Sequence, residues 1–116
     1  MILRKIDAMP SIAYGKGARK RVVIGPNEGA PAFVMRVFDV PPGGANMNHL
    51  YNFEHEVLIL QGQATCEGDG SDQYVSEGSA YFIPPNERHQ IVNTGKGNPR
   101  FICLVPVRGE DIDVPA

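Results

Sequence analysis

Short apolar segments separated by glycine and proline most constrain what this chain can fold into. They recur at intervals of about eight to twelve residues, are rich in β-branched and aromatic side chains, and carry no apolar stripe with the 3.6-residue period of a helix. A pattern of this kind predicts an all-β fold, either a sandwich or a small barrel. The segments predicted as strands are 22–24, 33–40, 56–61, 63–67, 73–76, 79–83, 89–93 and 101–105.

The length of 116 residues fits one domain. We expect residues 1–18 to form an arm with at most one short strand, because glycine and proline interrupt any helix there. Residues 19–109 are expected to form the barrel. The acidic tail, residues 110–116, is expected to fray.

The charge and the cysteine content narrow the possible partners and location. A net charge of −2 and a pI near 5.9 disfavour nucleic-acid or membrane-surface binding, which requires a sustained basic face. Neither a signal peptide nor a run of ~20 apolar residues is present, so we expect a cytoplasmic protein that does not enter a membrane. Cys66 and Cys103 lie within predicted strands and are expected to be free thiols.

The chain contains three histidines, and all of them lie at or near the entrances of predicted strands. Strand alternation places His49, Tyr51 and His55 on one side, and it places His89 on the same side of its strand as Ile91 and Asn93. Three converging imidazoles could hold a divalent transition metal and leave coordination positions open for a small molecule. The alternative is that they are ordinary strand histidines satisfied by hydrogen bonds.

Two predicted strands are apolar on both faces. In residues 33–40 the only charged side chains are Arg36 and Asp39, and all the others are apolar. Residues 101–105 carry no charged side chain. One face of each strand can fill the barrel. The other face needs a second layer or a second subunit, which predicts a homodimer.

Two motifs resemble those of the cupin family. The first consists of Pro-Gly-Gly, His49, His55-Glu56 and Gly62, and the second of Gly78, Pro84, Asn86, His89 and Asn93. Segments between residues 19 and 109 are also similar to small bacterial cupins that bind manganese through four histidines. These segments read RKRVVIG, FVMRVFDVPPGG, FEHEVLILQG, PPNERHQIVN and FICLVP.

The resemblance implies a double-stranded β-helix, or jelly-roll barrel, that is commonly dimeric. It also implies that His49, His55 and His89 ligate one divalent transition metal, with Mn, Fe, Ni and Zn as candidates. Tyr51 stands where the second histidine of the first motif is expected, and His55 stands where many cupins have glutamate. A neutral phenol is a poor ligand, so we expect Tyr51 to hydrogen-bond a metal-bound water or the substrate, as a catalytic residue. The expected cavity wall consists of Met47, Phe53, Val57, Ile59, Phe82, Ile91 and Phe101.

The resulting functional hypothesis is a metal-dependent enzyme acting on a small molecule. Cupins include dioxygenases, isomerases and decarboxylases, and the resemblance favours oxygen-dependent oxidation of the dioxygenase type. The alternatives are a non-catalytic cupin that binds or senses a small ligand or metal, and a structural dimer with a relict pocket. A cysteine nucleophile is disfavoured because no histidine lies near Cys66 or Cys103 in the sequence.

Overall fold

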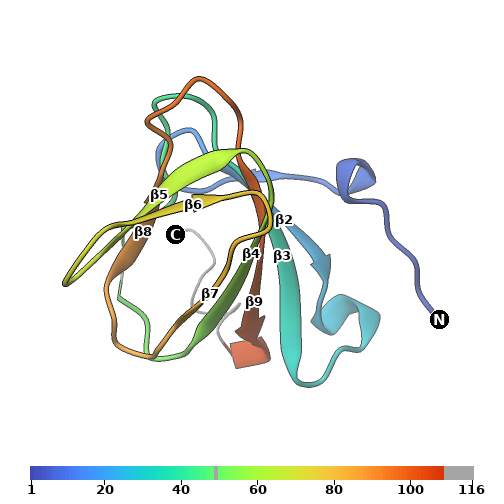
Figure 1. The fold of residues 1–116 in the computed structure, drawn as a ribbon. Helices are drawn as coiled ribbons and strands as arrows, with labels where there is room; N and C mark the ends of the chain where they lie inside the picture. Colours follow the sequence, from blue (N-terminus) through green and yellow to red (C-terminus); the bar gives the residue numbers. More distant parts are fainter. Residues whose placement is uncertain (49, 109–116) are drawn as a thin grey trace.

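The computed structural model describes residues 1–48 and 50–108 and confirms the all-β prediction. Over these residues the strands form two antiparallel sheets, which close around a common core (Figure 1). The larger sheet has the order β1-β2-β3-β9-β4-β7, and the smaller one has the order β6-β5-β8. The strands are β1 (Ile12–Ala13), β2 (Arg19–Ile24), β3 (Phe33–Asp39), β4 (His55–Gln61), β5 (Gln63–Gly68), β6 (Gln73–Ser76), β7 (Ala80–Ile83), β8 (His89–Val92) and β9 (Arg100–Pro106).

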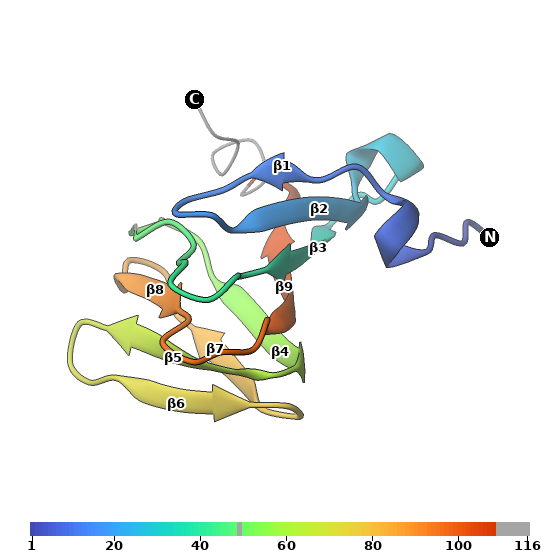
Figure 2. The same ribbon diagram turned by 90° about the horizontal axis from the view of Figure 1, so that it is seen from above.

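The first 18 residues contain the short strand β1 and a 3₁₀ helix, Ile6–Ala8. Viewed from above, β1 lies beside β2, and the chain before it extends away from the barrel (Figure 2). The acidic tail, residues 110–116, lies outside the described residues. No helix in the described part of the chain is long and apolar enough to cross a membrane.

Strand β4 shows the alternation expected from its sequence. His55, Val57 and Ile59 are buried, whereas Glu56 and Leu58 are exposed. This pattern follows because successive side chains of a strand point to opposite faces. The inner face of β4 therefore carries a histidine at its start and apolar residues behind it.

A turn at Gly62 separates β4 from β5. Its φ of 80° is in the left-handed region that glycine tolerates, and a Cβ atom here would lie 2.8 Å from Pro99 Cα. The turn therefore needs glycine for both its backbone angle and its space. It transfers the chain from the larger sheet to the smaller one.

Antiparallel register arranges the inner side chains of the larger sheet in rows. Arg36 of β3 is opposite Cys103 of β9, Cys103 is opposite Val57 of β4, and Val57 is opposite Tyr81 of β7. His55 occupies a neighbouring row, opposite Ile83 of β7. Residues far apart in the sequence thus meet on one inner surface.

Asn93 joins the loops at one end of the barrel. Its buried Nδ2 donates to the carbonyl oxygens of Val40 (2.9 Å) and Gly97 (2.8 Å), and its Oδ1 accepts from Gly95 N (3.0 Å). Nearby, Ala45 bridges to Val92 at the end of β8. These contacts hold the segment that leads toward the histidines.

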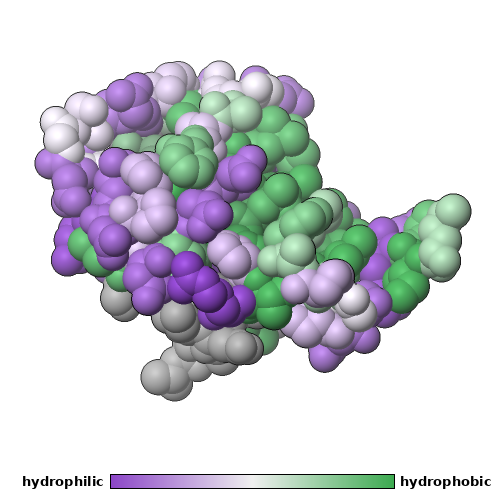
Figure 3. Space-filling view, turned by 90° about the horizontal axis from the view of Figure 1, so that it is seen from below, coloured by the Kyte–Doolittle hydropathy of each residue, from purple (hydrophilic) through white to green (hydrophobic). Residues whose placement is uncertain are grey.

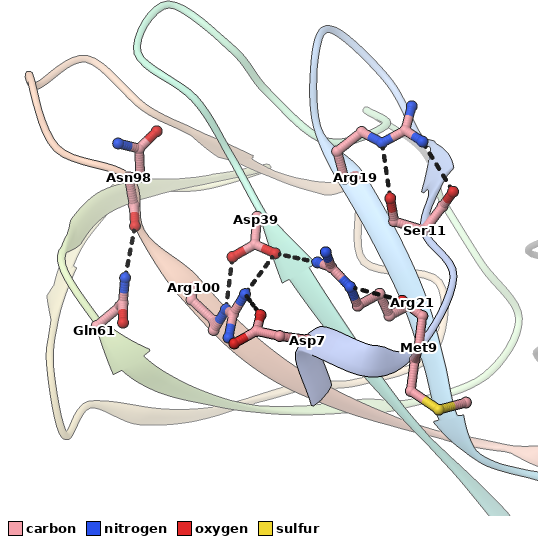
Figure 4. Close-up of polar contacts among 9 residues, drawn as sticks. All are labelled: Asp7, Met9, Ser11, Arg19, Arg21, Asp39, Gln61, Asn98 and Arg100. Carbon is pink, nitrogen blue, oxygen red and sulfur yellow. Dashed lines mark hydrogen bonds and ion pairs between the residues drawn. The ribbon is translucent and has the colours of Figure 1, made fainter. Parts of the chain in front are cut away.

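A charged cluster anchors the N-terminal arm to the larger sheet (Figure 4). Asp39 accepts hydrogen bonds from Arg21 (2.7 Å) and from Arg100 (2.7 Å), and Arg100 also donates to Asp7 (2.7 Å). Asp7 belongs to the 3₁₀ helix, whereas Asp39 and Arg100 are paired across β3 and β9. The cluster therefore connects the arm to the barrel.

Part of the outer face of the larger sheet, over β3, β9, β4 and β7, is apolar. Phe33 is 60% exposed, Leu58 41% and Phe82 59%, and an extended hydrophobic area is visible on the surface in Figure 3. Met35, Ile102 and Leu104 lie on the same face, partly buried. This is the second apolar face that the sequence predicted for β3 and β9.

Candidate metal and ligand site

His55 and His89 meet inside the barrel although they come from different sheets. Each is the first residue of its strand, β4 and β8, and the two side chains are buried. Their ring centroids are 4.6 Å apart, and the ring planes make an angle of 68°. The ring of Tyr51 lies beside both, with centroids 5.2 Å from His55 and 5.9 Å from His89. The structure therefore brings together two of the three predicted metal ligands, His55 and His89, and the predicted catalytic residue Tyr51.

His49, the third predicted ligand, lies outside the described residues. Within residues 1–48 and 50–108 no group of three or more His, Cys, Asp or Glu side chains is placed to hold a metal ion. The described site supplies two imidazoles. A three-histidine ligand set stays a prediction.

The protonation of both rings suits metal binding. The Nδ1 atom of His89 lies 3.0 Å from the carbonyl oxygen of Glu87, which can only accept, so Nδ1 carries a proton and Nε2 is the nitrogen that could ligate a metal. The pKa of His55 is lowered from 6.5 to about 3. Burial is the largest cause, and the electrostatic influence of His89 and of Arg36 adds to it. His55 is therefore neutral at physiological pH, as a metal-ligating imidazole must be.

His55 also has a polar atom in need of a partner. Its buried Nδ1 makes no hydrogen bond of good geometry with any described residue, and a contact with the Phe53 backbone opposes the fall of the His55 pKa only slightly. A buried polar atom left in this state costs about 1–3 kcal/mol. The two rings thus fit a divalent transition metal, or a bound water, between the sheets.

Tyr51 is a neutral hydroxyl in this pocket. Burial raises its pKa above 10, and the smaller opposing influence of Arg36 does not reverse the shift. Its hydroxyl oxygen lies 3.0 Å from that of Tyr14, and both rings are buried. In the metal-free pocket Tyr51 is therefore a neutral hydrogen-bond donor and acceptor.

A small pocket connects these side chains. Its volume of about 20 Å³ accommodates roughly one water molecule or ion. Of the predicted wall residues, Met47, Val57, Ile91 and Phe101 line it, together with Tyr51, His55 and His89. Three residues that the sequence pattern does not indicate also line the pocket, namely Tyr14, Arg36 and Cys103.

Three other predicted wall residues lie elsewhere. Phe53 and Ile59 are buried but do not line the pocket, and Phe53 instead stacks on His55 with ring centroids 5.1 Å apart. Phe82 is 59% exposed because it is opposite Glu56 in the register and shares its outward direction. The prediction that Phe82 lines the cavity is therefore wrong, because its side chain points to the outer face of the sheet.

Tyr14 reaches the pocket through a close backbone contact. The next residue, Gly15, has φ of 82°, and a Cβ atom there would lie 2.6 Å from the backbone carbon of Asn46. Glycine allows the arm to approach this segment, and Tyr14 is thereby carried to Tyr51. The Tyr-Gly pair was visible in the sequence, but its spatial neighbour was not.

The fold is a jelly-roll barrel of two antiparallel sheets with imidazoles at its interior. The family model described as "Cupin domain" matches residues 36–105, which is more than half of the chain. The chain belongs to the cupin family.

Individual relatives agree with this placement. An oxalate-binding protein of Thermotoga maritima is 30% identical over 67 residues, which are 57% of this chain and 55% of that protein. The chain thus spans little more than half the length of this curated relative. Among solved structures, the polyketide cyclase RemF of Streptomyces resistomycificus has a TM-score of 0.85 and 27% sequence identity. The aligned region covers 92% of this chain and 80% of the RemF chain. A predicted oxalate decarboxylase of Thermotoga maritima has a TM-score of 0.78 and 22% identity, covering 90% and 98%, and shows the shared fold.

Proposed function

We propose that this cupin is a metal-dependent enzyme that acts on a small oxygen-bearing molecule. The observation that carries the proposal is the meeting of two buried imidazoles from opposite sheets, His55 and His89, beside the ring of Tyr51. The ligands proposed for one Mn, Fe, Ni or Zn ion are His55, His89 and His49. Such an ion supplies Lewis-acid polarisation of a bound oxygen or, for a redox-active metal, access to oxygen chemistry.

The residues of the chain have separate roles in this proposal. His55 and His89 hold and orient the ion, and the Glu87 carbonyl fixes the tautomer of His89. Tyr51 donates a hydrogen bond, or a proton, to an oxygen of the substrate. Apolar side chains such as Val57 and Ile91 exclude bulk water from the reacting groups.

Two reaction classes remain to be separated. Oxygen-dependent oxidation is the one that the sequence resemblance favours. Non-redox chemistry, such as cyclisation or isomerisation of a carbonyl compound, is supported by the neutral Tyr51 hydroxyl and by the 27% identity to a polyketide cyclase. The alternative to both reaction classes is a non-catalytic module that binds a small ligand.

Metal content tests the site. We expect protein purified without chelators to hold about one equivalent of a transition metal, and a His55→Ala, His89→Ala double variant to hold much less. Gln90→Ala is the matched control, since this residue neighbours His89 in β8 with the opposite strand parity. Equal metal content in the double variant and the control would exclude the proposed ligands.

The reaction class is tested on metal-loaded protein. Oxygen uptake with enols and catechols indicates oxidation, whereas metal-dependent exchange of deuterium beside a substrate carbonyl without oxygen uptake indicates proton transfer. The metal-free protein is the control for both. Neither activity over a panel of such compounds, with ligand binding retained, would support the non-catalytic module.

A homodimer belongs to the same proposal. A second copy would cover the apolar outer face of the larger sheet, where Phe33, Leu58 and Phe82 are exposed. This cover lies outside the barrel and leaves the interior pocket intact. The oligomeric state is tested by one of the predictions below.

A further inference from the structure

The turn that connects β7 to β8 contains a backbone angle that most residues avoid (Figure 1). Asn86 has a φ of 67°, and in the part of the chain that the structure describes it is the only residue other than glycine with a positive φ. The left-handed region is unfavourable for residues that carry a Cβ atom. Such angles persist where the surrounding structure holds them, and they cluster at functional sites. The turn lies directly before His89, so its geometry bears on the site.

The sequence suits this angle without using the side chain of Asn86. Pro85 precedes it, and proline followed by asparagine is typical of a type II turn, in which the second of the two residues has a positive φ. The side chain of Asn86 is exposed, and the hydrogen bond that the residue makes comes from its backbone. Asparagine is therefore suited to this position because it tolerates the left-handed backbone.

The backbone of Asn86 holds Tyr51. Its N–H donates to the carbonyl oxygen of Tyr51 at 2.7 Å. Residues 50–54 lie outside the strands, so strand hydrogen bonds do not fix this segment. At the other end of the side chain, the hydroxyl of Tyr51 lies 3.0 Å from that of Tyr14. Tyr51 is thus held by its backbone at one end and by its hydroxyl at the other.

The next two residues of the turn fix the start of β8. The carbonyl oxygen of Glu87 lies 3.0 Å from Nδ1 of His89 and orients its ring. The backbone N–H of Arg88 donates to Oδ2 of Asp69, in the loop between β5 and β6, at 3.1 Å. These contacts anchor the turn on the side of the smaller sheet.

Asn86 is the pivot between the two sets of contacts. Because peptide groups are planar, the backbone angles of a residue set the direction of the peptide group before it relative to the one after it. The group before Asn86 binds Tyr51, and the group after it leads to Glu87 and His89. A change from positive to negative φ would redirect one of these groups away from the site.

We propose that Asn86 is a positioning residue whose left-handed backbone aligns Tyr51 and His89 toward their shared pocket. It acts through its backbone, and its side chain needs only to tolerate the angle. The proposal rests on the proposed function for the roles of Tyr51 and His89. The alignment itself is a property of the metal-free protein and can be measured there.

Substitutions at position 86 separate backbone tolerance from side-chain chemistry. Asn86→Gly keeps access to positive φ and removes the side chain, whereas the β-branched Asn86→Val disfavours this angle strongly. The readout is nitrogen NMR of the His89 ring, assigned by its absence in His89→Gln, in metal-free protein at a pH of about 9, well above the ordinary imidazole pKa.

We expect the unaltered protein and Asn86→Gly to carry the ring proton on Nδ1 of His89. Asn86→Val should lower the ratio of the Nδ1–H to the Nε2–H tautomer by roughly 10-fold, which corresponds to the usual cost of a left-handed residue. An unchanged ratio in a folded Asn86→Val variant would overturn the proposal. The same change in Asn86→Gly would place the role in the side chain and overturn it as well.

Gly78→Val is the matched control. Gly78 has a φ of 87° in the turn before β7, at the opposite end of this strand from Asn86, and a Cβ atom there would meet no atom within 4 Å. The variant introduces the same left-handed strain away from the site. We expect it to lower the free energy of unfolding and to leave the tautomer of His89 unchanged. An equal change of tautomer in both valine variants would show a general loss of stability and overturn the proposal.

A second measurement covers the case in which Asn86→Val does not fold. In the unaltered metal-free protein, scalar coupling through the hydrogen bond should connect the amide nitrogen of Asn86 to the carbonyl carbon of Tyr51. A missing coupling, or an Nε2–H tautomer of His89 in this protein, overturns the proposal. Because no metal is present in these experiments, a failure of the metal site would leave their result intact, and a failure here would leave the measured metal content intact.

Discussion

The hydroxyl oxygens of Tyr14 and Tyr51 lie 3.0 Å apart inside the barrel, although the two residues are separated by 37 positions. Their contact joins the N-terminal arm to the histidine pocket. It therefore couples the stability of the arm to the position of the hydroxyl that faces the site.

A double-mutant cycle measures this coupling. Tyr14→Phe and Tyr51→Phe each remove one hydroxyl, and we expect an interaction free energy of about 1 kcal/mol between them in urea unfolding. Either single substitution already removes the hydrogen bond between the two hydroxyls. The double variant therefore loses less stability than the sum of the two single variants. Strictly additive effects would show that the two hydroxyls do not interact in solution.

Replacing Tyr51 by histidine should tighten metal retention. Tyr51→His places a fourth imidazole beside His55 and His89, and an additional bond worth about 1.4 kcal/mol would lower Kd tenfold. Competition titration against a chelator measures the change. Tyr51→Phe is the control, and equal affinities for all three proteins would mean that position 51 does not face the ion.

Asp39 should contribute more to stability than Asp7. Asp39 is bonded by both Arg21 and Arg100 and its side chain is 26% exposed, whereas that of Asp7 is 79% exposed. We expect Asp39→Asn to lower the free energy of unfolding by about 1–2 kcal/mol, because charged hydrogen bonds within the sheet are lost. Asp7→Asn should lower it less, and added salt should diminish its effect further. Equal losses would contradict the assignment of Asp39 as the centre of the cluster.

Cys66 should react slowly with thiol reagents in the folded protein. Burial raises the pKa of its thiol, and the nearby Tyr81 hydroxyl opposes this only in part. The thiolate fraction at pH 8 is therefore lower than that of a free cysteine, and the rate should continue to rise with pH above the range where a free thiol saturates. Alkylation by iodoacetamide followed by peptide mass spectrometry gives the rate, which should lie well below that of glutathione because burial lowers both the thiolate fraction and the access of the reagent. A rate equal to that of glutathione would mean that Cys66 is exposed in solution.

The proposed dimer should depend on the outer face of the larger sheet. Phe82→Lys places a charge on this face, and we expect the sedimentation coefficient to fall to that of a monomer. Tyr74→Lys is the matched control, because Tyr74 is 68% exposed on β6 of the other sheet. A monomeric unaltered protein, or a dimer that tolerates Phe82→Lys, would contradict the proposed interface.

The sequence predicted features that depend on local pattern. Alternation along β4 places His55, Val57 and Ile59 inside, and the glycine-bounded turn at Gly62 is where the pattern placed it. The wall residue Phe82 was misassigned because its direction depends on the register between β7 and β4, which a single strand does not encode.

The neighbours that complete the pocket required the three-dimensional fold. In the sequence Arg36 is only an interruption of an apolar segment, and its place beside Cys103 follows from the pairing of β3 with β9. Tyr14 reaches Tyr51 through a loop contact at Gly15 that has no local signature. In both cases the deciding information lies in long-range pairing.

His55 and His89 are the first residues of β4 and β8, which belong to different sheets. A ligand bound by both rings would stabilise the packing of one sheet against the other. Its removal should therefore increase local opening between the two sheets before it affects the hydrogen bonds within either sheet. Amide hydrogens at the starts of β4 and β8 would then exchange faster in the stripped protein, while those in the middle of β3 and β9 would keep their protection.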